Sequence, residues 1–191
     1  MITIRKAMAS DLMAMQHCNL SNLAENYQLS LYLYFYSGWP DVSFVAENAQ
    51  GQVVGYVLSY VKKEEGKDSV GYICSLSVIR SYRRLGIAQR LMGQAHAAMV
   101  EGYDVELSTL NVRVSNSAAF NLYKNTLAYE VVKLEKKYYP DGEDAYSMTK
   151  RLADKKDKED TVEKTTARNP LAHYFLLAGA YLSMYVLLSF I

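Results

Sequence analysis

The sequence predicts a mixed α/β domain, and three features of the chain predict it. Short segments with alternating or continuous apolar residues are typical of strands. Between them lie longer segments with apolar residues at helical spacing. Hairpin signals join some of the strands, and one strand leads into a helix and then into another strand. Hairpins together with such a crossover indicate a sheet of mixed direction.

The first half of the chain predicts two helices and four strands. Ile2 to Lys6 alternates as a strand, and Ser10 and Asp11 can cap a first helix. After a break at residues 24–26, a second helix is expected through Tyr36. The other strands of this half are expected over Asp41–Glu47, Gln52–Lys63 and Gly71–Val78, with turns at residues 48–51 and 64–69.

The second half predicts a long helix, a short helix and three strands. Ala88–Val100 has helical spacing, and Val105–Val114 has the composition of a strand. We expect a short helix over Ser115–Asn125, followed by strands over about residues 129–138 and 144–151.

The loop before the long helix has the composition of an anion-binding turn. It consists of Arg83, Arg84, Leu85, Gly86, Ile87 and Ala88. A helix start leaves about four backbone N–H groups without internal partners and carries roughly half a positive charge. Gly86 lets the backbone approach a ligand closely. The loop therefore suits a phosphate or pyrophosphate, although so short a pattern also fits an ordinary strand-to-helix turn.

Charge and cysteine content exclude several classes of function. The net charge is +1 and the basic residues are scattered, so no nucleic-acid partner is expected. Cys18 and Cys74 show neither metal-ligand spacing nor a disulfide framework, which favours a reducing compartment and predicts no metal site. The N-terminus lacks the apolar segment of a secretory signal. We expect a cytoplasmic catalytic domain.

The chain divides into three parts: a domain over residues 1–152, a charged linker over 153–170 and an apolar tail over 171–191. Five basic and five acidic residues, with almost nothing apolar, make residues 153–168 typical of a disordered linker. Leu171 to Ile191 has no formal charge, and a helix of that length spans about 30 Å. The tail predicts a single transmembrane helix that anchors the domain on the cytosolic face of a membrane. The alternative is a helix that docks on a partner protein.

Several ordered runs resemble the GNAT acyltransferases and, within them, the catalytic subunits of N-terminal acetyltransferase A (NatA) complexes. The anion-binding loop, the strand before it and Asn116–Tyr123 carry the resemblance, which covers about residues 1–152. Further matching runs are residues 11–20, 25–27, 54–58, 80–86 and 137–146. The resemblance implies a GNAT fold with a mixed central sheet flanked by about four helices. The tail lies outside it.

By this resemblance the co-substrate is acetyl-CoA. Its pyrophosphate would lie on the backbone N–H groups of Arg83 to Ala88, and Leu76, Ser77 and Val78 would bond the pantetheine arm as an added strand. The strand that ends at Val78 should diverge from the strand at 105–114 to make room, with an N–H near Val78 as oxyanion donor. Arg113 and Asn116 are implied in cofactor binding or site geometry. A plain alternative for Arg113 is an ion pair at the end of a strand.

The resemblance also implies the catalytic groups. Glu25 is the expected base or amine-positioning group, Tyr72 a proton relay, and Tyr123 the acid that protonates the departing thiolate. For Glu25 the alternative is an exposed loop carboxylate, and for Tyr72 it is core packing. The tyrosines expected at the peptide entrance are Tyr27, Tyr138 and Tyr139.

The sequence thus predicts an N-terminal α-amino acetyltransferase. By the resemblance, its substrates would start with Ser, Ala, Thr or Gly when a helical-repeat auxiliary subunit links it to the ribosome, and with acidic residues when it acts alone. Two positions depart from the family: Asn111 stands where histidine is common, and Ala24 where proline is common. Asn111 keeps open a membrane-tethered CoA-binding module without turnover. A lysine acetyltransferase is a third reading.

Overall fold

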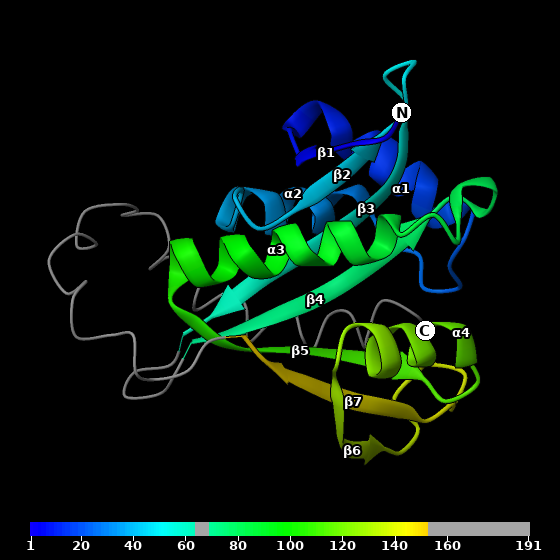
Figure 1. The fold of residues 1–191 in the computed structure, drawn as a ribbon. Helices are drawn as coiled ribbons and strands as arrows, with labels where there is room; N and C mark the ends of the chain where they lie inside the picture. The colour runs from blue at the N-terminus through cyan, green and yellow to red at the C-terminus, as the bar shows by residue number, and fades with distance from the viewer. Residues whose placement is uncertain (64–68, 153–191) are drawn as a thin grey trace, which may run out of the picture.

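A computed structural model describes residues 1–63 and 69–152 of the chain. Its seven strands form one sheet in the order β1-β2-β3-β4-β5-β7-β6 (Figure 1). The strands are β1 (Thr3–Lys6), β2 (Phe44–Glu47), β3 (Val53–Lys62), β4 (Ser69–Val78), β5 (Val105–Arg113), β6 (Glu130–Glu135) and β7 (Ala145–Arg151). The helices are α1 (Leu12–Leu20), α2 (Leu29–Gly38), α3 (Ile87–Tyr103) and α4 (Ser117–Asn121), with single turns η1 (Ala9–Asp11), η2 (Arg80–Tyr82) and η3 (Leu122–Thr126).

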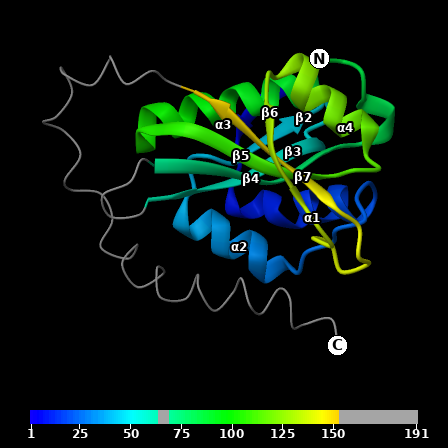
Figure 2. The same cartoon turned by 90° about the horizontal axis from the view of Figure 1, so that it is seen from below.

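The sheet is the middle of three layers. Helices α1 and α2 cover one face, and α3 and α4 cover the other (Figure 2). Strand β3 shows why the sequence folds this way, because its successive side chains enter different cores. Tyr56 and Leu58 pack with Met15 of α1, whereas Val57 packs with Met92 of α3.

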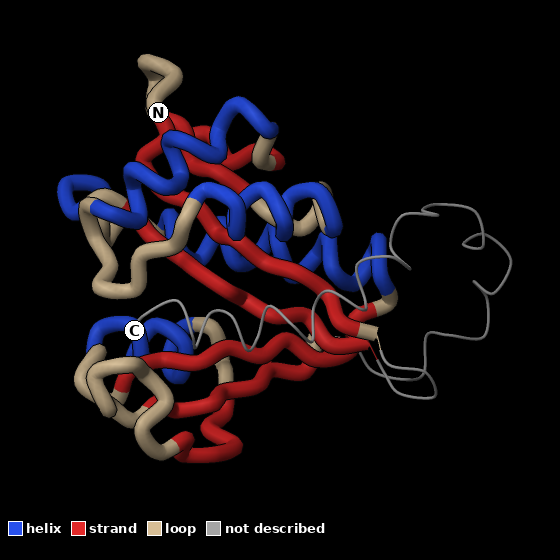
Figure 3. Tube along the Cα trace, turned by 180° about the vertical axis from the view of Figure 1, so that it is seen from behind, coloured by secondary structure: helices blue, strands red, loops and turns tan. Residues whose placement is uncertain are grey.

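Strands β4 and β5 run parallel and then separate. They pair from Ser69 with Val105 to Tyr72 with Thr109, and no further. Beyond that point β4 continues to Val78 beside β3, and β5 continues beside β7. The divergence is visible from both sides (Figures 1 and 3). The expected separation of these strands is therefore confirmed.

The α/β class, the mixed sheet and four α-helices agree with the sequence expectations. The position of β7 between β5 and β6 was not expected, because strand order depends on contacts between distant segments. The expected helix over 115–125 is short and ends in a π-helical turn over Leu122–Thr126. The transmembrane helix expected over 171–191 lies outside the described residues. Within residues 1–63 and 69–152, none of the helices has the length and hydropathy needed to span a bilayer.

Candidate active site

A groove of about 2330 Å³ opens where β4 and β5 separate. The start of α3, the α1–α2 loop and the β6–β7 loop form the rest of its walls. All of the site residues expected from the sequence line it except Leu85, whose side chain is 62% exposed. The lining residues from that set are Glu25, Tyr27, Tyr72, Leu76, Ser77, Val78, Arg83, Arg84, Gly86, Ile87, Ala88, Arg113, Asn116, Tyr123, Tyr138 and Tyr139.

The loop before α3 presents unpaired backbone donors. Arg84 and Gly86 have φ angles of 64° and 73°, and Gly86 precedes the first helical residue without a side-chain cap. The first helical bond runs from the Arg90 N–H to the Gly86 carbonyl at 3.1 Å. In the part of the chain that the structure describes, no acceptor is bonded to the backbone N–H groups of residues 84–89. Free donors at the positive end of a 17-residue helix form a seat for an anion.

The two arginines of this loop differ. Arg83 donates from Nε to the Val78 carbonyl at 3.0 Å and from Nη2 to Asn22 Oδ1 at 3.0 Å. Its guanidinium therefore ties the end of β4 to the α1–α2 loop. Arg84 is exposed and has no side-chain partner among the described residues, so its charge is available to a ligand.

The open edge of β4 offers alternate backbone groups to the groove. The Ile79 N–H donates to the Val54 carbonyl on the β3 side at 2.9 Å, and backbone groups alternate sides along a strand. Leu76 and Val78 therefore face the open edge, whereas Ser77 faces β3. The Ser77 hydroxyl also donates to the Cys18 carbonyl at 3.3 Å and is buried. The pairing of β4 with β3 therefore turns the Ser77 N–H away from the groove, and the expected bond of Ser77 to the pantetheine stays a prediction.

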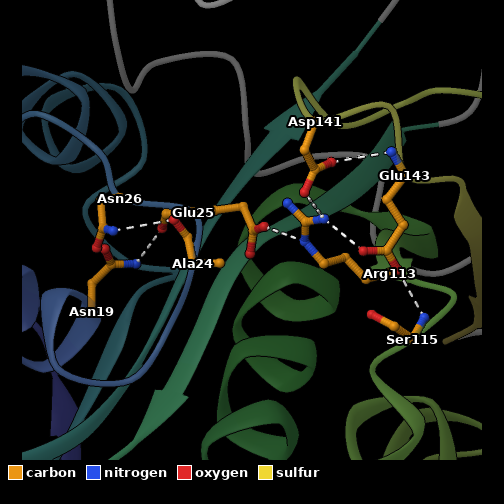
Figure 4. A network of polar contacts seen from close by, with 8 residues as sticks. All are labelled: Asn19, Ala24, Glu25, Asn26, Arg113, Ser115, Asp141 and Glu143. Atoms are coloured by element: carbon orange, nitrogen blue, oxygen red, sulfur yellow. Dashed lines mark hydrogen bonds and ion pairs between the residues drawn. The ribbon is translucent and has the colours of Figure 1, made fainter.

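Glu25 is held from both ends (Figure 4). Its backbone carbonyl accepts a hydrogen bond from Asn19 Nδ2 at 3.0 Å, and its Oε1 accepts one from Arg113 Nε at 2.5 Å. On the other side, Arg113 Nη1 lies 2.8 Å from Asp141 Oδ2 and 2.7 Å from Glu143 Oε2. Glu25 is thus an anchored carboxylate, not the exposed loop carboxylate of the alternative reading. Arg113 forms the ion pair at a strand end that the sequence left open.

Tyrosines surround these charges at the mouth of the groove. The Arg113 guanidinium lies 3.9 Å from the centre of the Tyr139 ring, and Asn111 Nδ2 donates to the Tyr138 hydroxyl at 3.0 Å. Burial raises the pKa of Tyr27 and of Tyr139, so both stay neutral at physiological pH. Neutral rings and hydroxyls therefore lie beside the Arg113 ion pairs at the mouth of the groove.

The remaining expected residues have different surroundings. Tyr123 lies on the π-helical turn, only 8% exposed, and burial raises its pKa to about 12. Tyr72 stacks on Tyr60 with 4.8 Å between ring centres. Asn116 caps α4, since its Oδ1 accepts from the Ala119 N–H at 3.1 Å. The amide oxygen of Asn116 is therefore already occupied by the helix cap.

The sequence reasoning gave no role to Asp141, Glu143 or Asn19. Asp141 and Glu143 lie in the run at 137–146 that contributes to the resemblance, but their contact with Arg113 spans about 30 positions of sequence. The clustering of acidic residues around Gly142, typical of a turn, was the one available signal. Among the residues that the structure describes, no group of three metal-ligating side chains occurs.

Comparison with known proteins matches residues 10–129 to the model of the acetyltransferase (GNAT) family. The chain is 53% identical to the N-alpha-acetyltransferase daf-31 of Caenorhabditis elegans over 152 residues, which cover 80% of this chain and 84% of that protein. It is 51% identical to the N-terminal acetyltransferase A complex catalytic subunit ard1 of Schizosaccharomyces pombe, covering 85% of this chain and 94% of that protein.

A solved structure with the same fold is Chaetomium thermophilum Naa20 in complex with a bisubstrate analogue. It has a TM-score of 0.71 and 31% identity, covering 78% of this chain and 86% of that one. The NatB acetyltransferase complex bound to CoA and MES gives a TM-score of 0.70 and 27% identity, covering 79% and 99%.

Proposed function

Because this chain belongs to the acetyltransferase (GNAT) family, we propose that it is the catalytic subunit of an N-terminal acetyltransferase of the A-complex type. It is an N-alpha-acetyltransferase that uses acetyl-CoA as acetyl donor. One observation supports the proposed site above all others. The opening between β4 and β5 joins an anion seat at the start of α3 to an anchored carboxylate at the far wall.

The groove offers the chemical groups that acetyl-CoA binding needs. The unpaired N–H groups of residues 84–89 suit the pyrophosphate, with the Arg84 side chain as an added cation. Leu76 and Val78 present their backbone groups on the open edge of β4, where an extended amide-containing arm can bind as a strand does. The Val78 N–H is then the oxyanion donor for the thioester carbonyl, a contact worth about 3 to 4 kcal/mol in comparable enzymes.

The acceptor amine must lose a proton before it attacks. An α-amine has a pKa of about 8, against about 10.4 for a lysine side chain, so a modest base suffices for a chain terminus. Glu25 Oε1 is bonded to Arg113, but Oε2 has no partner among the described residues. We assign Oε2 to accept the ammonium proton, directly or through water, with Tyr72 available as a relay.

The rest of the reaction needs a proton for the leaving group. As the nitrogen–carbon bond forms and the carbon–sulfur bond breaks, the thiolate takes the proton of Tyr123. The second proton of the amine returns to the tyrosinate through solvent. Since burial raises the pKa of Tyr123 to about 12, the phenol enters each cycle protonated.

We also propose an auxiliary partner and a substrate range. One named relative, ard1, is an A-complex catalytic subunit, and α1 and α2 leave Met13, Leu20 and Leu33 between 51% and 62% exposed. Such a surface suits a helical-repeat subunit that also contacts the ribosome. With it, substrates start with Ser, Ala, Thr or Gly. Without it, acidic termini are preferred.

Membrane attachment is a separate proposal for residues outside the described ones. Residues 171–191 act as a tail anchor, residues 153–170 as the linker, and the catalytic domain faces the cytoplasm. The support is the length and the lack of formal charge of the tail.

Single-turnover acetylation tests the central proposal. We expect the full chain to acetylate a Ser-starting peptide and to leave an N-blocked, lysine-containing peptide unmodified, with the yield raised by a co-expressed auxiliary subunit. Acetyl-CoA binding without transfer would indicate a binding module. Transfer to lysine alone would indicate a lysine acetyltransferase.

A further inference from the structure

The Arg113 cluster contains more negative than positive charge. One guanidinium contacts the carboxylates of Glu25, Asp141 and Glu143, at 2.5, 2.8 and 2.7 Å. The cluster therefore keeps an excess of two negative charges at the mouth of the groove. Arg113 is 15% exposed and Glu25 and Glu143 are 28% and 27% exposed, so water screens these two contacts less than the one to Asp141, which is 59% exposed.

The three carboxylates are not equivalent. Asp141 and Glu143 both accept from Nη1, on one side of the guanidinium, whereas Glu25 accepts from Nε on the other. Figure 4 shows Arg113 between Glu25 and the pair from the β6–β7 loop. Glu25 thus accepts one N–H of Arg113 through Oε1 and keeps Oε2 free. The carboxylates of Asp141 and Glu143 neutralise the guanidinium on its other side.

Backbone contacts fix the pair in place before any substrate arrives. Asp141 Oδ1 accepts from the Glu143 N–H at 3.1 Å, and Glu143 Oε1 accepts from the Ser115 N–H at 2.8 Å. Hydrogen bonds from Ser115 and then from Arg113 lower the pKa of Glu143 to about 2. The pair is therefore ionised throughout the working pH range.

We propose that Asp141 and Glu143 are positioning residues that hold and neutralise Arg113, so that Glu25 and the excess negative charge serve the α-ammonium of the substrate. This inference rests on the proposed role of Glu25. A cation approaching Glu25 would otherwise meet the positive charge of Arg113 at close range, and like charges repel. With both carboxylates in place, the ammonium enters a negative site although a guanidinium lies within it.

The tyrosines and the cysteine near Glu25 are neutral and add no charge to the cluster. Tyr27 of the α1–α2 loop and Tyr139 of the β6–β7 loop face it, and burial raises the pKa of each. Tyr138 and Cys74 lie in the next ring, and burial raises the pKa of both of them as well. The charged groups around Glu25 are therefore Arg113 with its two other carboxylates, and Lys137 of the β6–β7 loop, which lines the same groove.

Charge-neutralising variants of the full chain test the proposal. Glu143→Gln and Asp141→Asn each remove one negative charge next to Arg113. Asp144→Asn is the matched control, because Asp144 lies on the same loop but pairs with Lys136 and not with Arg113. The readouts are kcat and KM for a Ser-starting peptide as functions of pH, together with the melting temperature.

Removing a negative charge favours loss of a proton from the bound ammonium. We therefore expect Glu143→Gln and Asp141→Asn to shift the acidic limb of the pH profile of kcat to lower pH by about half a unit. Both variants should also raise the peptide KM about threefold. Asp144→Asn should leave both unchanged. Glu143→Asp, which keeps the charge, should return the limb to its wild-type position even where kcat is lower.

Two results would overturn the inference. One is an acidic limb that does not move in either charge-neutralising variant while the wild-type chain is active. The other is an equal movement in Asp144→Asn, since that would indicate a general charge effect. Failure of the wild-type chain to acetylate any N-terminal peptide would instead overturn the proposed function, so the two failures are distinguishable.

Discussion

Replacing Gly86 by alanine tests whether the left-handed turn before α3 forms the coenzyme A seat. Gly86 has a φ of 73°, and a Cβ placed there meets no atom within 4 Å. The change therefore adds no collision. It does add the penalty of a left-handed residue with a side chain, about 1 to 2 kcal/mol.

That penalty divides between folding and binding. If the variant loop stays left-handed, the whole penalty appears in the free energy of unfolding, and 1 kcal/mol lowers the melting temperature of a chain of this size by about 2 to 4 °C. If the loop relaxes in the free protein, acetyl-CoA binding must restore the turn. The dissociation constant then rises, by about tenfold for 1.4 kcal/mol. The two losses together should equal about 1 to 2 kcal/mol.

Gly93 provides the matched control. It lies inside α3, is exposed, and a Cβ there also meets nothing within 4 Å, but its backbone is helical. Gly93→Ala should raise the melting temperature, because alanine favours a helix over glycine by about 1 kcal/mol. Acetyl-CoA affinity should not change.

Melting curves and calorimetric titration with acetyl-CoA measure both quantities for both variants. The reasoning fails if Gly86→Ala changes neither the melting temperature nor the affinity. It also fails if both alanine variants raise the melting temperature and leave acetyl-CoA affinity unchanged, since the φ angle would then not govern the effect.

Three further predictions follow from other parts of the chain. Tyr123→Phe should lower kcat about 100-fold and leave acetyl-CoA affinity unchanged, as loss of a general acid does; stopped-flow thiol release measures this, and an unchanged kcat would exclude Tyr123 as the acid. His96 is buried against the Tyr129 hydroxyl at 2.8 Å, and burial lowers its pKa from 6.5 to about 4. The unfolded chain thus binds a proton that the folded chain does not, so stability present above pH 6.5 should fall by up to about 3 kcal/mol toward pH 4. Urea unfolding across this range, with His96→Gln as a variant lacking the group, tests the sign. For the tail, alkaline carbonate should leave the full chain with membranes and release a version ending at Leu152, and release of both would favour a partner-docking helix.

Local chemistry made part of this site predictable from the sequence. The loop at residues 83–88 follows from an apolar strand, a glycine and a helical pattern in direct succession. The contact between Glu25 and Arg113 was missed because it joins residues far apart in the sequence. Glu25 and Arg113 are separated by 88 positions, and no periodicity relates them. The direction of the Ser77 N–H could not be predicted for another reason, because it depends on the pairing of β4 with β3.

Hydrogen bonds also connect the backbone carbonyl of Glu25 to strand β4. Asn19 is fully buried, and its Nδ2 donates both to the Glu25 carbonyl and to the Tyr56 hydroxyl, at 3.0 and 3.1 Å. The Tyr56 hydroxyl lies 2.7 Å from Ser75 Oγ on β4. Asn19 Oδ1 has no partner among the described residues, yet turning the amide over would direct an acceptor at the Glu25 carbonyl. The orientation is therefore fixed, and one chain of hydrogen bonds links the Glu25 carbonyl to β4.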